Sequence, residues 1–396
     1  MGILKRPPGD EFTFRLFFKL KSKIQRPSDS IYLWSAMLDP NYQFGWWESE
    51  GVWVEENELN YRAHLLESIK QDVVIIGIKD HLTSKNFNPW IQKIPTIVEY
   101  LIDMFNYYSD KKFILITSVE NLESYISNNN VSIVCWGGDL TNQQAEYNNL
   151  NPIVNKNFDS KHTFLSLNRN NRAQRLILLS MVHGMNIQEH GLISCMFREE
   201  LTDPFVDTQW QFDNQLEAKE LVRSGFCKLM SSNSLLSDDK DIYGSATNDN
   251  VSNFETKLIP YYQNTFVELI TETSYTETAY LLTEKTLNSI YGCNFPILLC
   301  GCGSVELLRK IGFDVFDDII DHSYDTIQNP IERMHRAVAD NLTLLTDNAT
   351  TKKLWLENKH RFLSNVNVAK TTMYEFYSKR ALDKIDKLNY ELNIQN

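Results

Sequence analysis

The feature that most limits the fold of this sequence is a series of short, β-branched apolar runs that alternate with segments of helical periodicity. Two such segments, Ile91–Tyr108 and Ser118–Asn128, separate apolar runs in the first 150 residues. The expected strands of this region are Ile31–Leu33, Asp72–Ile78, Lys112–Thr117 and Val131–Trp136. Apolar strands that alternate with helices are typical of a parallel sheet covered on both faces. The sequence therefore predicts an N-terminal α/β domain over residues 1–150.

A second series follows the polar stretch Asn148–His162, whose many Asn, Asp, Lys and Pro residues predict a linker between domains. The expected strands are Thr163–Leu167, Leu192–Met196, Phe266–Thr271, Pro296–Cys300 and Val315–Phe316. The expected helices are Gln174–Gly184, Glu284–Tyr291 and Val305–Ile311. These elements predict a second α/β domain over residues 151–340. The helical pattern from Glu332 to Leu392 predicts a helical tail over residues 341–396.

The composition is typical of a soluble globular protein. The 396 residues include 51 acidic and 39 basic side chains, which give a formal net charge of −12. This balance disfavours a broad nucleic-acid surface, because phosphate binding needs clustered Lys and Arg. No apolar run approaches the ~20 residues of a bilayer span, and the six cysteines form no disulfide or zinc framework. We therefore expect a cytoplasmic protein without a membrane span. The many Asn, Ile, Lys and Tyr residues are typical of an AT-rich coding sequence, and if that sequence is viral, the protein is expected in the host cytoplasm.

The strongest chemical signal lies in residues 264–303, where a strand leads through a polar loop to a helix that Thr283 opens and Gly292 closes. A helix N-terminus presents free N–H groups and the positive end of its dipole, so it attracts phosphate. Lys285 adds a charge in the first turn, and Glu284 can accept hydrogen bonds from ribose hydroxyls. Together these groups suit a nucleoside diphosphate. In the alternative interpretation Thr283 is only a cap, Glu284 favours the dipole and Lys285 is solvated.

This segment resembles the donor-binding motif of the α-1,3-fucosyltransferase family. In that family a strand ends in an acidic E-x-S loop, which leads to a helix start with Ser or Thr, Glu and Lys, then to a Gly and a strand that begins with Pro. The resemblance covers roughly residues 161–325, and this chain departs from the pattern at Thr273 and Gly303. The matching residues are Phe266, Glu272, Ser274, Thr283, Glu284, Lys285, Gly292, Pro296 and Ile297, with the aromatic Tyr280 one position early.

The resemblance implies a fold of the GT-B type, in which two Rossmann-like α/β domains face a cleft and the C-terminal one binds the donor. It also implies inverting transfer of a sugar from a nucleotide-diphosphate donor, such as GDP-fucose, to an acceptor hydroxyl. No metal and no cofactor besides this substrate are expected. The acceptor stays open among a glycan, a protein, a lipid-linked sugar and a modified DNA base. The implied donor-binding residues of this motif are Glu272, Tyr280, Thr283, Glu284 and Lys285.

Three arginines form a second candidate block, Arg169, Arg172 and Arg175, between a strand and an apolar helix. In fucosyltransferase-like proteins an arginine that opens a helix at this point contacts the donor diphosphate, and Arg175 fits that role best. Guanidinium groups suit a phosphate leaving group because they are permanently charged and bind in a forked geometry. The alternative is that these arginines lie on a solvated turn or pair with nearby glutamates.

The catalytic base is harder to assign, because inverting transfer needs a carboxylate from the N-terminal domain. The family often has a Gly-Glu-Asn sequence after an N-terminal strand, and Asp139 stands at the nearest place in this chain. A turn or capping role is the alternative for Asp139. Other motifs carry less weight: Glu306 replaces the third glycine of a dinucleotide fingerprint, Asp239-Lys-Asp241 lies in a polar loop, and His183 and His190 lack a third metal ligand.

The sequence therefore favours a two-domain glycosyltransferase. One alternative is a glycosyltransferase of viral type that modifies a DNA base. The other is a non-catalytic module that binds a nucleotide or a sugar. The oligomeric state is open in all three hypotheses.

Overall fold

The computed structural model describes residues 31–35, 73–78, 105–106, 109–124, 126, 128–137, 140–141, 144, 147–168, 173–195, 214–231, 254–272 and 282–394. The chain divides into two compact units. The first comprises Met1–Leu82, Lys93–Asn142 and Glu375–Asn396. The second comprises Thr83–Gln92 and Gln143–Tyr374. The described residues include no helix that is both long and apolar enough to cross a membrane.

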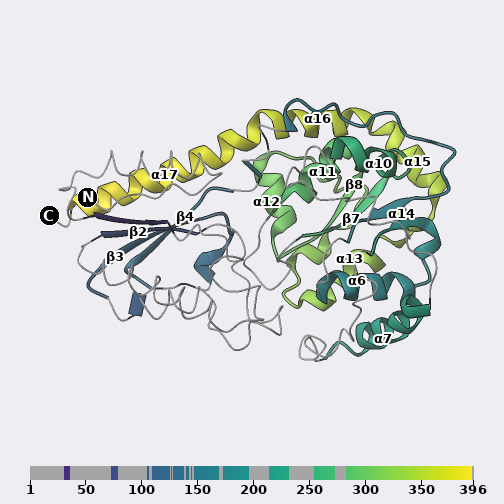
Figure 1. The fold of residues 1–396 in the computed structure, drawn as a ribbon, viewed down its shortest axis with the longest axis horizontal. Helices are drawn as coiled ribbons and strands as arrows, with labels where there is room; N and C mark the ends of the chain where they lie inside the picture. Colours follow the sequence, from purple (N-terminus) through teal and green to yellow (C-terminus); the bar gives the residue numbers. More distant parts are fainter. Residues whose placement is uncertain are drawn as a thin grey trace. The chain divides into compact units, whose positions relative to one another are not determined.

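The described part of the first unit contains a four-stranded parallel sheet (Figure 1). Its strands are β1 (Ile31–Ser35), β2 (Val73–Ile78), β3 (Lys112–Thr117) and β4 (Val131–Cys135), in the order β1-β2-β3-β4. The 3-10 helix η4 (Leu122–Ser124) follows β3. Residues Phe113–Thr117 and Ile133–Cys135 are buried, as the apolar runs predict for strands covered on both faces. The expected parallel α/β sheet is confirmed.

The last helix of the chain, α17 (Thr372–Ile394), supplies most of its length to the first unit. Arg380 on this helix donates to the buried carboxylate of Glu120 over 2.6 Å. The ring of Tyr377 packs on Gly137, which has a φ of +63° and leaves no room for a Cβ atom. Only glycine combines this left-handed backbone with so close an approach. The first unit is thus built from both ends of the sequence.

The second unit contains another parallel sheet, β5 (Phe164–Ser166), β6 (Gly191–Ile193), β7 (Val267–Thr271) and β8 (Phe295–Leu299), in the order β6-β5-β7-β8. The strand order changes direction between β5 and β7. In Figure 1 helices α10 (Ile259–Gln263), α11 (Glu284–Gly292) and α16 (Lys359–Lys370) lie on one side of this sheet, and α6 (Ala173–Gly184) and α13 (Pro330–Ala339) lie on the other. The first helices of this unit are α6 (Ala173–Gly184), α7 (Leu216–Ser231), α10 (Ile259–Gln263), α11 (Glu284–Gly292) and α12 (Ser304–Ile311).

The C-terminal region is helical, as expected. Its helices before α17 are α13 (Pro330–Ala339), α14 (Leu342–Thr346), α15 (Asn348–Glu357) and α16 (Lys359–Lys370). The prediction of a strand at Val315–Phe316 is wrong. Phe316 has a φ of +63°, and its N–H donates to the side chain of Asp314 over 2.9 Å. This local turn replaces the ladder bonds that a strand would need.

The polar segment expected as a linker, Asn148–His162, lies within the second unit and packs against its helices. The N–H of Ile153 donates to Tyr291 O over 2.8 Å. Lys156 is buried, and its ammonium donates to Tyr262 O and Gly292 O over 2.7 Å and to Asn294 Oδ1 over 2.5 Å. The polar side chains of this segment therefore satisfy backbone carbonyls at the ends of α10 and α11.

We expect Lys156→Met to lower the free energy of unfolding by about 3 kcal/mol, because it leaves three buried oxygens without their donor. Burial lowers the pKa of Lys156 to about 7, so the deficit should be measured by urea denaturation at pH 6, where the ammonium form is kept. Lys353→Met is the matched control, since that side chain is 76% exposed. Equal stability of the two variants would contradict the role given to Lys156.

Candidate functional site

The candidate site lies at the carboxyl ends of β5 and β7, where the strand order of the second sheet changes direction. In parallel α/β sheets this edge is the usual place for a ligand. Asn168 joins the strand ends there: its side-chain amide donates to Ser166 O over 3.2 Å and to Ser194 O over 3.2 Å. Thr271, the last residue of β7, donates to Asn168 Oδ1 over 3.4 Å. Asn168 is not among the residues that the sequence motifs indicate, although an amide residue directly after an expected strand is a signal of such an edge.

Arg175 lies in the first turn of α6 and is only 3% exposed. Its neighbour Gln174 donates to the backbone oxygen of Glu272 over 3.4 Å. Two blocks about 100 residues apart in the sequence therefore meet at one edge of the sheet. The burial of Arg175 disfavours the alternative of a solvated turn. Arg169 and Arg172 lie outside the described residues.

The carboxylate of Glu272 is fully buried at the start of α11, whose N-cap residue is Thr283. It accepts hydrogen bonds from Thr283 N over 3.0 Å, Thr283 Oγ1 over 2.6 Å and Thr286 Oγ1 over 2.7 Å. A buried carboxylate needs such donors, and the positive end of a helix stabilises it further. The N-terminus of α11, which the sequence analysis assigned to a phosphate, is thus occupied by an acidic side chain of the protein itself.

Lys285 and Glu284 form an ion pair in the first turn of α11. Their Nζ and Oε1 atoms are 2.7 Å apart, and Lys285 Nζ also donates to Thr283 Oγ1 over 2.9 Å. A second carboxylate, that of Glu272, lies 4.0 Å from the same ammonium. Burial alone would raise the pKa of the Glu284 carboxyl, but the Lys285 ammonium beside it lowers this pKa to about 2. At neutral pH Glu284 is an ionised, one-quarter exposed acceptor, which suits a ligand hydroxyl better than a phosphate.

The two remaining candidates, Tyr280 and Asp139, lie outside the described residues. The structure therefore brings together Arg175, Glu272, Thr283, Glu284 and Lys285. Their pattern is a buried cation beside one strand end and an acidic cluster beside the next.

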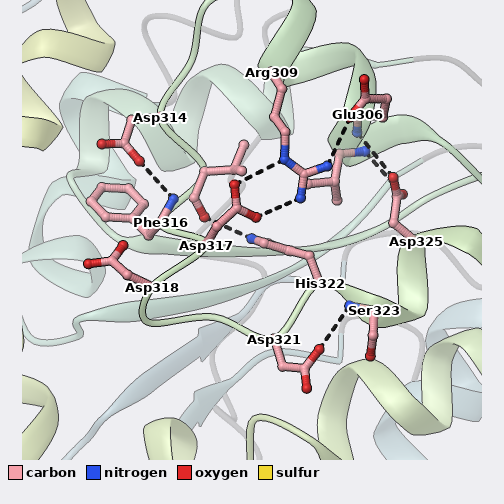
Figure 2. Close-up of polar contacts among 12 residues, drawn as sticks. Glu306, Arg309, Asp314, Phe316, Asp317, Asp318, Asp321, His322, Ser323 and Asp325 are labelled. Atoms are coloured by element: carbon pink, nitrogen blue, oxygen red, sulfur yellow. Dashed lines mark hydrogen bonds and ion pairs between the residues drawn. The ribbon is translucent and has the colours of Figure 1, made fainter.

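A second helix N-terminus near this sheet also carries a protein carboxylate. Asp325 is buried and accepts hydrogen bonds from Val305 N over 3.1 Å and Glu306 N over 3.0 Å at the start of α12 (Figure 2). The loop between β8 and α12 contains Gly301 and Gly303, the glycines that resemble a dinucleotide fingerprint. Because Asp325 already neutralises the helix dipole, this loop lacks the electrostatics of a phosphate site.

Acidic residues that follow α12 in the sequence form ion pairs and hydrogen bonds within the second unit. Arg309 binds Asp317 through two nitrogens, at 2.6 and 3.1 Å, and His322 contacts the carbonyl of Val315 over 2.7 Å (Figure 2). Burial lowers the pKa of His322, which keeps its ring neutral. Within the described ranges, no group of three His, Cys, Asp or Glu side chains is placed to hold a metal ion.

Comparison with protein-family models and with curated proteins gives no match to this chain. The interpretation of the site therefore depends on its own chemistry and on the sequence motifs.

We expect Glu272→Gln to lower the free energy of unfolding by about 2–4 kcal/mol, because the amide cannot accept from all three donors at the start of α11. Chemical denaturation measures the difference. Glu357→Gln, at a position 56% exposed, should change little. A Glu272→Gln protein with wild-type stability and impaired ligand binding would instead make Glu272 a ligand contact.

The ion pair of Glu284 and Lys285 should make stability depend on pH. Because folding lowers the pKa of Glu284 to about 2, the stabilisation is fully present above its unfolded value of 4.5 and is lost as pH falls towards 2. At pH 7 we expect Glu284→Gln to be about 1–3 kcal/mol less stable than the wild type, and at pH 3 the gap should shrink. Urea denaturation at both pH values tests this. Glu220→Gln, from an exposed pair on α7, is the control.

Proposed function

We propose that the protein is a glycosyltransferase that takes its sugar from a nucleotide-diphosphate donor. The observation that carries this proposal is the hydrogen bond from Gln174 to Glu272, which joins the two fucosyltransferase-like blocks at one sheet edge. That edge has the position at which parallel α/β sheets bind nucleotides. A GT-B arrangement of two Rossmann-like domains is part of the proposal, supported by the parallel sheet in each unit.

The charges of the site suggest a division of roles. The buried guanidinium of Arg175, at the positive end of α6, is proposed to bind the donor diphosphate and to stabilise the charge that develops on it as the sugar leaves. Glu284 is proposed to accept hydrogen bonds from ribose hydroxyls. Lys285, paired with Glu284, would hold that carboxylate in place rather than contact phosphate directly.

The remaining parts of the proposal come from the family resemblance. They are an inverting reaction without a metal, a GDP-fucose-like donor and a catalytic base at Asp139 in the N-terminal unit. An inverting base removes the proton of the acceptor hydroxyl while that oxygen attacks the anomeric carbon and the nucleotide diphosphate leaves. The acceptor is a glycan, a protein, a lipid-linked sugar or a modified base.

A non-catalytic nucleotide- or sugar-binding module is the second candidate. The hydrogen bond from Thr283 N to Glu272 and the Glu284–Lys285 pair favour it, because both are internal contacts at the start of α11. Incubation with GDP-, UDP-, CDP- and TDP-sugars separates the candidates. A transferase slowly hydrolyses one of them or transfers its sugar, whereas a binding module is stabilised by one of them and leaves it intact.

We expect Arg175→Lys and Arg175→Ala to weaken binding of the stabilising nucleoside diphosphate by about 10- to 100-fold, which corresponds to ~1.5–3 kcal/mol for charge-assisted hydrogen bonds. Calorimetric titration at one pH measures the affinity. Because Arg175 is buried, the melting temperature of each variant must first show that it folds, and Arg175→Lys keeps the charge for this purpose. Arg223→Ala, at a position 57% exposed on α7, is the matched control. Unchanged affinity in both Arg175 variants would remove the diphosphate assignment.

A further inference from the structure

The first unit contains a pocket of about 610 Å³ that the proposed donor site does not use. It lies between the edge strand β4, η4 and one face of α17. Ile133 and Cys135 of β4 and Phe376 of α17 form an apolar part of its lining. Its volume is in the range of small-molecule sites, which are mostly apolar with a few polar groups that orient the ligand.

The rest of the α17 face in this pocket is mainly basic. Its cationic lining residues on α17 are Lys379, Arg380, Lys384 and Lys387. The two acids of the lining are Asp383, on the same helix, and Glu123, on η4. The α17 positions recur every three or four residues, so they share one side of the helix. The described lining thus contains four cationic side chains and two carboxylates.

Two of these cations already have carboxylate partners. Arg380 is held by the buried Glu120, and Lys387 lies 3.9 Å from the exposed Glu391. Among the described residues, neither Lys379 nor Lys384 has a carboxylate oxygen within 4 Å of its ammonium group. The two acids of the described lining, Glu123 and Asp383, form no ion pair within 4 Å with either lysine. Two ammonium groups beside the pocket are therefore available to an anion.

The described residues at the base of the pocket are Ile133 and Cys135, and the carboxylate of Glu120 lies beside the Cys135 thiol. Ile133 and Cys135 are each 4% exposed, and burial raises the pKa of the Cys135 thiol well above its usual value. A cationic wall above an apolar floor fits a molecule with a phosphate at one end and a ring at the other. A free inorganic anion would leave the apolar part empty.

We propose that this pocket binds a phosphorylated small molecule, with its phosphate against Lys379 and Lys384 and its ring on Ile133, Cys135 and Phe376. The recognition depends on charge, because ammonium groups act as point charges for phosphate. It does not depend on the donor site of the second unit or on transfer activity.

Calorimetric titration of the full chain at low salt with AMP and glucose 6-phosphate, and with adenosine and glucose as matched probes, tests this site. We expect at least one phosphorylated probe to bind ten-fold or more tightly than its unphosphorylated counterpart. The double variant Lys379→Gln/Lys384→Gln should weaken that binding ten-fold or more. The control variant Lys310→Gln/Lys353→Gln, at exposed lysines of the second unit, should change it less than two-fold.

A further variant separates this pocket from the proposed donor site. Arg175→Lys should leave binding of the phosphorylated probe within two-fold of the wild type. Loss of binding in Arg175→Lys, with normal binding in the double lysine variant, would place the probe in the second unit and overturn the proposal. The proposal would also be overturned if no probe binds at millimolar concentration, or if phosphorylated and unphosphorylated probes bind with equal affinity. If only the proposed donor site in the second unit is wrong, the expected binding of the phosphorylated probe to this pocket stays the same.

Discussion

The second unit depends on one buried ammonium group. Lys156 joins the ends of α10 and α11 and the residue before β8, because its three donors meet three oxygens of Tyr262, Gly292 and Asn294. Tyr262 extends this network, since its hydroxyl donates to the buried carboxyl of Glu268 in β7 over 2.9 Å. Burial raises the pKa of Glu268 to about 8. This network connects β7 to the helices, because separating any of its members would leave a buried polar group without its partner.

The same requirement shapes the candidate site. Acidic side chains of the protein lie at the N-termini of two helices of the second unit, Glu272 at α11 and Asp325 at α12. These acidic groups disfavour an anionic ligand at either terminus, and the diphosphate contact proposed above is Arg175 in the first turn of α6 instead. The acidic start of α11 is better matched to hydroxyl groups. A ligand that carries phosphates and sugar hydroxyls fits this distribution of charge along the edge.

The sequence was sufficient for the strands of the two parallel sheets, because apolar β-branched runs such as Lys112–Thr117 depend mainly on local composition. It was insufficient where distant partners decide the outcome. Residues around Lys156 have the composition of a linker, yet carbonyls more than 100 residues away bind its ammonium. At Phe316 the side chain of Asp314 offers the backbone a turn that an apolar pair does not reveal. Thr283 was predictable as a cap, whereas the burial of Glu272 beneath it depends on how β7 meets α11.

The contribution of α17 to the first unit affects the order in which the protein can be completed during synthesis. Arg380 and its partner Glu120 are 260 residues apart, which at roughly 5–20 residues per second is a delay of roughly 10–50 s on the ribosome. During that interval the carboxylate of Glu120 lacks its guanidinium and the backbone at Gly137 lacks the ring of Tyr377. The strands that are made first therefore belong to the unit that is finished last.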